Sequence, residues 1–327
     1  MDLTYLIGYR QALEAKIADE YPQTIDSKSL NAPIHYLMNL GGKRIRPTLT
    51  LISCELFGGK KENALHTALA IEVFHNFTLM HDDIMDKAPI RRGMLTVHKK
   101  WDENQAILSG DTMLVHAYQH LLKDKPDAIL NILERFNQTA IEVCEGQQLD
   151  MQFEKRNDVT VDEYIEMIRL KTAVLLGAAL ELGAQIASAS KDNLERIYDF
   201  GQLLGIAFQL KDDLLDVFGE QDKIGKQVAG DILSNKKTYL YLKAMELADE
   251  NQKKDLTHYY SSTDFEDSDK IVAVKEIFST LNIMEITEQE VKHFHSEALK
   301  ALDAIDADEE KKKALYLIAE QLFVRQY

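Results

Sequence analysis

Positive charge is scarce in this chain of 327 residues. Lysine and arginine together number 38, against 54 aspartates and glutamates, so the formal net charge is −16 at pH 7. A field of that sign repels nucleic acids and anionic membranes, and we expect neither as a partner. An anionic substrate would need a local concentration of lysine, arginine or metal ions.

Cysteine and long apolar runs are also scarce. Only Cys54 and Cys144 are present, and their spacing indicates neither a disulfide framework nor a zinc site. No stretch approaches the roughly 18 uninterrupted apolar residues of a membrane span, and the N-terminus lacks a basic segment followed by an apolar one. We therefore expect a cytoplasmic protein without stable membrane insertion.

Proline is missing from most of the chain, since all five prolines lie within the first 126 residues. A β protein rich in turns would need more of them. Apolar residues recur at helical spacing, and Thr160 with Glu163 predicts a capping box before a helix that runs from Tyr164 into Gly183. Because no linker or repeat interrupts the chain, the sequence predicts one all-α domain over residues 1–327.

Two acidic clusters share one pattern, HDDIMD at 81–86 and KDDLLD at 211–216. Helix positions four apart lie on one face, so the pattern gives two carboxylate pairs: Asp82 with Asp86, and Asp212 with Asp216. Magnesium takes one or two carboxylates and keeps other positions for water and substrate phosphate. The middle aspartates, Asp83 and Asp213, point about 100° away and are expected to support the pairs.

A single DDxxD on a helix is more often a solvated acidic face. Here each cluster is embedded in apolar sequence, FTLMHDDIMD and GIAFQLKDDLLDVFG. Carboxylates beside a core are costly unless something neutralises them. The repetition of the pattern therefore favours metal binding over a solvated face.

Basic residues are grouped near these clusters. The segment GGKRIRP at 41–47, a loop or a helix start, carries Lys43, Arg44 and Arg46. Arg91 and Arg92 follow Asp86 at the expected end of the first acidic helix. After the second cluster come Lys223 and Lys226 in DKIGK, then Lys236 and Lys237 in NKKT. Each alone would be read as a surface side chain, but their shared placement favours phosphate binding. His75 lies about 20° off the stripe of Asp82 and should face the same site.

These motifs in combination resemble the trans-isoprenyl diphosphate synthases, or polyprenyl synthetases. The resemblance covers most of the chain, in the order GGKRIRP, FHNFTLMHDDIMD, APIRRG, KTAVLLGAA, FQLKDDLLD and GKQVAGDILSNKKT. It implies a bundle of about ten or more helices around a deep central pocket, usually as a homodimer. It also implies head-to-tail condensation of isopentenyl diphosphate with an allylic diphosphate, with Mg²⁺ as cofactor, three ions when substrate is bound.

The resemblance implies site residues by position. The principal metal ligands would be Asp82, Asp86 and Asp212, supported by Asp83, Asp213 and Asp216. Isopentenyl diphosphate would be bound by Lys43, Arg46, His75 and Arg92. The allylic diphosphate would be held by Arg91, Lys171, Lys226 and Lys236, with Thr172 and Gln209 beside the reacting carbons. Of these, the residues expected to promote ionisation are Asp82, Asp86, Asp212, Arg91, Lys171 and Lys226. No side-chain general base is expected, because the released diphosphate can take the proton.

Product length should depend on what closes the pocket. The residues that precede the first acidic motif would line it, namely Phe77, Thr78, Phe74 and Ile71. Phe77 resembles the bulky floor of short-chain synthases, and the motif without an insertion resembles that of geranylgeranyl-type enzymes. On an ideal helix, however, Phe77 lies about 140° from Asp82, and Thr78 and Ile71 lie closer to its face. We expect a C15 to C20 product, with C20 favoured.

Four alternatives remain open from the residues alone. They are a longer-chain polyprenyl diphosphate synthase, a terpene cyclase, an HD-type metallophosphohydrolase built on His81, Asp82 and an upstream His66 or His75, and a helical subunit that only binds a partner. A cyclase normally lacks the second acidic motif and the GGKRxRP loop. Intact acidic and basic motifs weigh against a non-catalytic subunit.

Overall fold

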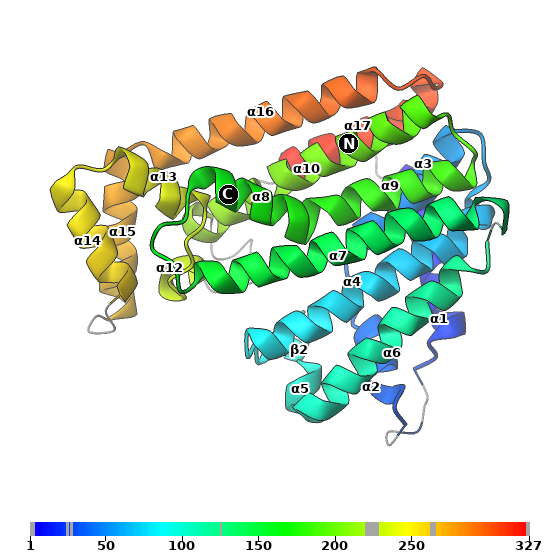
Figure 1. Ribbon diagram of the computed structural model, residues 1–327, viewed down its shortest axis with the longest axis horizontal. Helices are drawn as coiled ribbons and strands as arrows, with labels where there is room; N and C mark the ends of the chain where they lie inside the picture. The colour runs from blue at the N-terminus through cyan, green and yellow to red at the C-terminus, as the bar shows by residue number, and fades with distance from the viewer. Residues whose placement is uncertain are drawn as a thin grey trace. The chain divides into compact units, whose positions relative to one another are not determined.

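The computed structural model describes residues 4–23, 26, 29–124, 126–219, 229–261 and 266–324. These residues are mostly helical, which confirms the predicted all-α class (Figure 1). The strands described are β1 (Ile90–Arg91) and β2 (Met94–Leu95), which pair antiparallel. None of the described helices is long and apolar enough to cross a membrane.

The chain divides into two compact units, each described here by itself. Unit 1 comprises Met1–Asn137, Ala178–Tyr198 and Ile305–Leu315, and unit 2 comprises Gln138–Gly177, Asp199–Ala304 and Tyr316–Tyr327. The prediction of a single domain stays a prediction. In order along the chain, the helices before residue 220 are α1 (Thr4–Glu20), α2 (Ala32–Met38), α3 (Ile45–Leu56), η1 (Lys61–Ala64), α4 (Leu65–Met85), α5 (Val97–Lys100), α6 (Glu103–Leu121), η2 (Pro126–Ala128), α7 (Ile129–Phe153), α8 (Val161–Ile168), η3 (Arg169–Ala173), α9 (Val174–Ile186) and α10 (Lys191–Phe218). The remaining helices are α12 (Gly230–Leu233), α13 (Tyr239–Leu247), α14 (Glu250–Ser261), α15 (Asp267–Thr280), α16 (Ile283–Asp303) and α17 (Glu309–Phe323).

Helix α4 is the core helix of unit 1. It packs against α6, α3 and α1, and most of its residues from Thr67 to Phe77 are buried. Gly110 of α6 meets α4 so closely that a Cβ there would lie 2.2 Å from His81 Nε2. This contact fixes α6 against the end of α4 that carries the first acidic cluster.

The segment GGKRIRP is a loop only up to Arg44, which caps α3 and anchors the segment to this core. Arg44 is 3% exposed, has a left-handed backbone (φ 51°), and donates from Nη1 to Glu72 at 2.5 Å and from Nε to Glu14 at 3.0 Å. Glu72 lies on α4 and Glu14 on α1, so the ion pairs tie the loop to both helices. Arg44 therefore has a structural role.

The position of the two arginines after the first acidic cluster had suggested that they end its helix, but they lie beyond it. Helix α4 ends at Met85, and Arg91 and Arg92 lie in the β1–β2 hairpin. Pro89 cannot continue a helix, and the positive φ angles of Arg92 (52°) and Gly93 (77°) form the tight turn between the strands. The hairpin carries Arg91 back towards α4, where it contacts Asp83.

In unit 2, the predicted capping box of Thr160 and Glu163 begins α8. The helix expected from Tyr164 into Gly183 is found, but as α8 and α9 joined by the π-helical turn η3. Gly146 of α7 allows a close approach to this turn, since a Cβ there would lie 2.3 Å from Lys171 N. Further along the chain, α14 reaches Ser261 and α15 starts at Asp267, while residues 262–265 lie outside the described part.

Candidate active site

The first acidic cluster lies at the C-terminal end of α4. Asp86 is the C-cap, and its backbone N–H donates to the carbonyl of Asp82 at 2.8 Å, so helical geometry continues through the motif. Asp82 is partly buried and Asp86 is exposed. The two carboxylates stand on one helix face, as the spacing predicted.

The middle aspartate of this cluster has a different environment. Asp83 is 2% exposed, and Arg91 donates to its two carboxylate oxygens from Nε at 2.9 and 2.8 Å and from Nη2 at 2.7 Å. Burial raises the pKa of Asp83 although Arg91 opposes that shift. In this structure Asp83 holds Arg91 in place, and its predicted role in metal binding stays a prediction.

A cationic cluster lies in the same unit. Arg46 Nη1 lies 3.4 Å from His75 Nε2, and Arg92 donates to the carbonyl of Gly41. Gly42 leaves room for this arginine, since a Cβ there would lie 3.1 Å from the Arg92 guanidinium. Lys43 is exposed at the edge of the same loop. Three of the four residues predicted to bind isopentenyl diphosphate, Arg46, His75 and Arg92, are thus brought together.

The electrostatics of this cluster favour a bound anion. Burial lowers the pKa of His75 well below 6.5, and Arg46, Arg92, Arg91 and Arg44 lower it further. Burial also lowers the pKa of Arg46 to about 10, and its buried Nε has no hydrogen-bond partner among the described residues. A concentration of like charge around a neutral imidazole, within a chain of charge −16, is stabilised by an anion.

Phe74 and Phe77, two of the residues predicted to set product length, form an aromatic column on α4 together with His81. Phe77 packs on Phe74 and on His81, with ring centroids 5.6 and 4.8 Å apart, and Phe74 packs on Phe136 at 5.1 Å. Ile71 is fully buried, whereas Phe77 is 9% exposed. Thr78 Oγ1 donates to the carbonyl of His75. Phe77 is thus the least enclosed of the large apolar side chains in this set.

The second acidic cluster lies near the end of α10 in unit 2. Asp212 and Asp216 are partly buried and stand four residues apart on the helix. Asp213 is 3% exposed, and it accepts from Tyr164 Oη at 2.5 Å and from Gln209 Nε2 at 3.0 Å. The middle aspartates of both clusters are therefore buried and hydrogen-bonded within their own units.

Negative charge is crowded around Asp213. Burial, Asp231 and Asp212 raise the pKa of Asp213 to about 8, even though the hydrogen bonds from Tyr164 and Gln209 oppose this. Asp231 lies close because its backbone N–H donates to Asp216 Oδ2 at 2.9 Å. A divalent cation would relieve this repulsion, so the donor set and its charge fit a magnesium ion.

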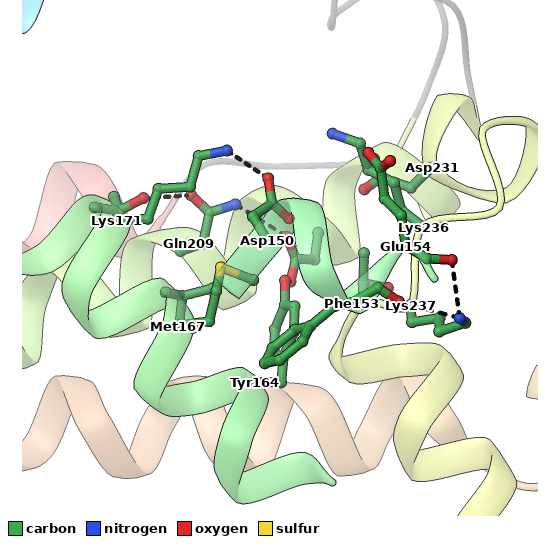
Figure 2. A pocket seen from close by; sticks show the side chains of 14 residues that line it. Asp150, Phe153, Glu154, Tyr164, Met167, Lys171, Gln209, Asp231, Lys236 and Lys237 are labelled. Atoms are coloured by element: carbon green, nitrogen blue, oxygen red, sulfur yellow. Dashed lines mark hydrogen bonds and ion pairs between the residues drawn. The ribbon is translucent and has the colours of Figure 1, made fainter. Parts of the chain in front are cut away.

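A pocket in unit 2 opens beside this cluster (Figure 2). Its lining includes Lys171, Thr172, Gln209 and Lys236, four of the residues predicted to hold the allylic substrate. Thr172 Oγ1 donates to Gln209 Oε1 at 3.3 Å. Lys171 and Thr172 both lie in the π-helical turn η3, a type of turn that is frequent at functional sites.

The pocket also contains residues that the sequence did not single out. Asp150 accepts from Lys171 Nζ at 2.5 Å, while Tyr164 and Asp231 flank the second acidic cluster. Asp150 lies one turn after Gly146, and a glycine within a long helix was the available signal. Lys237 Nζ donates to backbone carbonyls at the end of α7, Phe153 at 3.0 Å and Glu154 at 3.2 Å, so this lysine is a helix cap.

Two predicted lysines cannot be placed. Lys223 and Lys226, the latter expected on the allylic diphosphate, lie outside the described residues. The histidines needed for an HD-type hydrolase are placed, and they do not assemble one. His66 stacks on His120, His75 lies beside Arg46, and His81 Nε2 contacts the carbonyl of Ile107.

Comparison with known proteins identifies the class. A family model described as "Polyprenyl synthetase" matches residues 27–278, and the chain belongs to this family. It is an enzyme of the prenyltransferase class. This settles the choice against the terpene cyclase, the HD-type hydrolase and the non-catalytic subunit.

Individual proteins and a solved structure are similar to this chain over most of its length. The chain is 41% identical over 236 residues to a geranylgeranyl diphosphate synthase of Methanosarcina mazei, covering 72% of each chain. It is 36% identical over 318 residues to a short chain isoprenyl diphosphate synthase of Methanothermobacter thermautotrophicus, covering 97% of this chain and 95% of the relative. A crystal structure of a geranylgeranyl pyrophosphate synthase superposes with a TM-score of 0.93 at 43% identity, covering 98% of this chain and 99% of the other.

The crowding at Asp213 predicts how stability depends on pH. Its pKa rises from 3.8 to about 8 on folding. The folded state therefore binds the proton more tightly, and this contribution is complete below pH 3.8 and lost as pH rises through about 8. Across that window the metal-free protein should lose up to about 1.4 kcal/mol of unfolding free energy per pH unit.

Urea unfolding in EDTA, at about pH 5 and pH 7, measures this dependence. Asp213→Asn should flatten it, whereas Asp255→Asn, on the exposed face of α14, should leave it unchanged. Equal pH dependence in wild type and Asp213→Asn would contradict the prediction.

Proposed function

We propose that this enzyme condenses isopentenyl diphosphate head to tail with an allylic diphosphate and so makes a trans-prenyl diphosphate. The observation that carries the proposal is that this acidic protein has both paired carboxylates and a cluster of arginines. Two helices each present carboxylates four residues apart, and a separate cluster concentrates arginines around His75. The first arrangement suits Mg²⁺ and diphosphate, and the second suits a diphosphate bound by side chains alone.

The cationic cluster of unit 1 is proposed to bind isopentenyl diphosphate. Arg46 and Arg92 present planar guanidinium groups that match phosphate oxygens in pairs. Lys43 adds an exposed ammonium group, and neutral His75 donates a hydrogen bond without adding to the charge repulsion. Arg44 is excluded from this role by its ion pairs with Glu72 and Glu14.

The allylic diphosphate is proposed to be held by Arg91, Lys171, Lys226 and Lys236. Asp82, Asp86, Asp212 and Asp216 would hold Mg²⁺, with three ions when substrate is bound. When bound, Mg²⁺ neutralises the charge that develops on the departing diphosphate. Asp150 orients Lys171 at 2.5 Å, and Asp83 orients Arg91, so both cations are held before substrate arrives.

The chemistry follows from the groups near the reacting carbons. The allylic C–O bond breaks, and the electron pair leaves with the diphosphate. The double bond of isopentenyl diphosphate then forms the new C–C bond, and a proton is lost to the released diphosphate. Thr172 and Gln209 are proposed to lie beside these carbons, where their oxygen dipoles would stabilise the allylic cation.

The activity is tested by supplying isopentenyl diphosphate, an allylic diphosphate and Mg²⁺, and by analysing the prenyl product. Elongation should disappear with EDTA and return with Mg²⁺. Asp82→Asn and Asp212→Asn should each lower kcat by at least about 100-fold, because each removes a charge that acts in the transition state. Asp255→Asn, on α14, is the matched control. Failure to elongate any allylic primer would overturn the proposal.

We further propose a C20 product, supported by relatives named as geranylgeranyl diphosphate synthases and by the aromatic column on α4. Phe77 would limit the growing chain together with Thr78, Phe74 and Ile71. Phe77→Ala should lengthen the product by one or more isoprene units, as measured by mass spectrometry of the prenyl alcohols. Phe57→Ala removes a partly buried phenyl at the end of α3 and should leave product length unchanged. A C20 product from Phe77→Ala would remove the basis for this assignment, and a longer wild-type product would favour a longer-chain synthase.

A homodimer is proposed from the surface of α6. Ile107, Leu108, Val115 and Leu122 are 43–61% exposed and fall within about 100° of one another around the helix axis, and the opposite face is buried in unit 1. An apolar stripe of this kind on an acidic protein suits a second copy of the same chain.

Light scattering after size exclusion measures the assembly. The wild type should elute as a dimer, and Leu108→Glu should shift it to a monomer because it buries a charge in the interface. Val272→Glu is the control, since Val272 is equally exposed, at 56%, on α15. A dimer that persists in Leu108→Glu would rule out this face. The cytoplasmic location expected from the sequence stays a proposal.

A further inference from the structure

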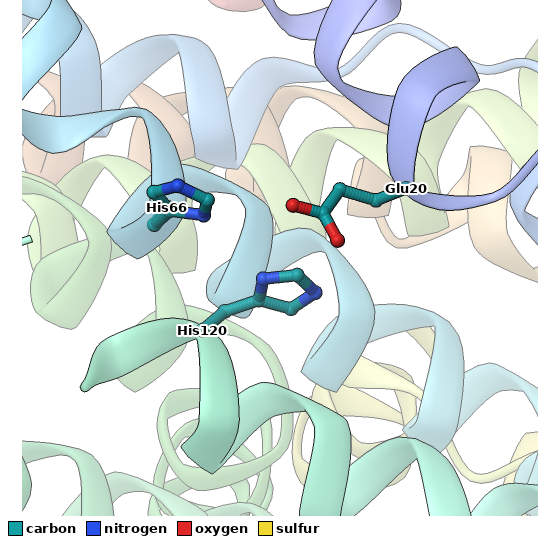
Figure 3. Close-up of side chains that lie close together, drawn as sticks. All are labelled: Glu20, His66 and His120. Atoms are coloured by element: carbon teal, nitrogen blue, oxygen red, sulfur yellow. The ribbon is translucent and has the colours of Figure 1, made fainter. Parts of the chain in front are cut away.

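A second group of possible ligands lies in unit 1, among residues that the proposed reaction does not use. Glu20 is the last residue of α1, His66 is in the first turn of α4, and His120 is in the last turn of α6. Their side chains converge from the three helices on one space (Figure 3). One ligand atom of each lies within 4.8 Å of the other two.

The hydrogen bonding of these residues is incomplete. His120 is 4% exposed, and its Nδ1 has no partner among the described residues; the same holds for the buried Nδ1 of His66. His120 Nε2 lies 3.0 Å from Tyr21 Oη. If Nε2 carries the proton and donates to Tyr21, then Nδ1 keeps its lone pair for a metal ion. Histidines that ligate a metal are commonly oriented in this way.

We propose that Glu20, His66 and His120 bind a divalent transition metal such as Zn²⁺. Two imidazoles and one carboxylate are a ligand set that Zn²⁺ accepts, with water in the fourth position. Mg²⁺ prefers oxygen ligands, so this site is chemically distinct from the aspartate clusters. The metal would tie together the ends of α1, α4 and α6.

The protonation states support binding at neutral pH. Burial lowers the pKa of His120 to about 4 and also lowers that of His66, so both rings are neutral and able to ligate. Burial works against ionisation of Glu20, but Lys16 and Lys123 lower its pKa to about 2. His116, His35 and Asp124 also lie near these groups, and Asp124 accepts the backbone N–H groups of His66 and Thr67.

A metal ion bound to Glu20 would replace the ion pairs that Lys16 and Lys123 make with this carboxylate. Lys16 Nζ lies 2.9 Å from Glu20, but also 3.6 Å from Asp19, so it retains a carboxylate partner when it moves. Lys123 Nζ approaches Glu20 no closer than 3.4 Å and is exposed. Lys16 and Glu20 are partly buried and Lys123 is exposed. Ion pairs that water can reach contribute little to stability, so a metal ion can displace them.

The test uses the full chain in saturating Mg²⁺, which occupies the aspartate clusters. Cu²⁺ is the spectroscopic probe, because electron paramagnetic resonance resolves nitrogen ligands from oxygen ligands. The wild type should show two coordinated imidazole nitrogens. His66→Gln and His120→Gln should each show one fewer, and His258→Gln, on the exposed face of α14, should match the wild type.

Zn²⁺ binding by calorimetry provides a second measurement. Tyr21→Phe keeps all three ligands but removes the oriented hydrogen bond, and it should weaken Zn²⁺ binding by about 10–100-fold. Glu20→Gln should weaken it as well. Circular dichroism establishes that each variant is folded. An unchanged nitrogen pattern in both histidine variants, or Zn²⁺ affinity equal to the wild type in Tyr21→Phe and Glu20→Gln, would overturn the proposal.

Discussion

Repulsion between like charges is the constraint on which the rest of this structure depends. Asp213 is buried beside Asp212 and Asp231, and His75 is surrounded by arginines. Neither arrangement lowers the free energy of the protein alone, because each keeps charges of one sign close together in a poorly solvated place. Each would become favourable when the opposite charge arrives with the proposed metal ion or diphosphate. The folded protein therefore already includes the unfavourable free energy of holding these like charges together before any ligand binds.

Close packing holds these groups together against their repulsion. Gly110 brings α6 onto the end of α4 that carries the first acidic cluster, and Gly146 brings α7 onto the turn that carries Lys171. The buried pair of Arg44 and Glu72 fixes the start of α3, the helix that carries Arg46. In both units, the charged residues of the proposed site are thus held in place by an adjacent ion pair or by a close glycine contact. Substitution of the supporting residues should therefore disturb the site without removing a ligand.

The sequence predicted the helical class, the paired aspartates and the grouping of Arg46, His75 and Arg92, because these follow from local spacing and from motifs. It did not predict that Asp83 binds Arg91, since the return of the chain depends on the hairpin after Pro89. Asp150, Tyr164 and Asp231 were missed for a related reason. Their proximity to the predicted residues arises from contacts between segments that are distant in sequence, which periodicity does not report.

The π-helical turn at Arg169–Ala173 has a consequence for how this region tolerates change. A turn that closes i to i+5 contains one residue more than an α-helical turn. The apolar positions before and after it therefore belong to two different helical registers, offset by about 100°. Removal of a single residue from this segment would restore one continuous register, and would rotate either Lys171 or the whole buried face of α9 out of place. The length of this segment is thus as constrained as the identity of its residues.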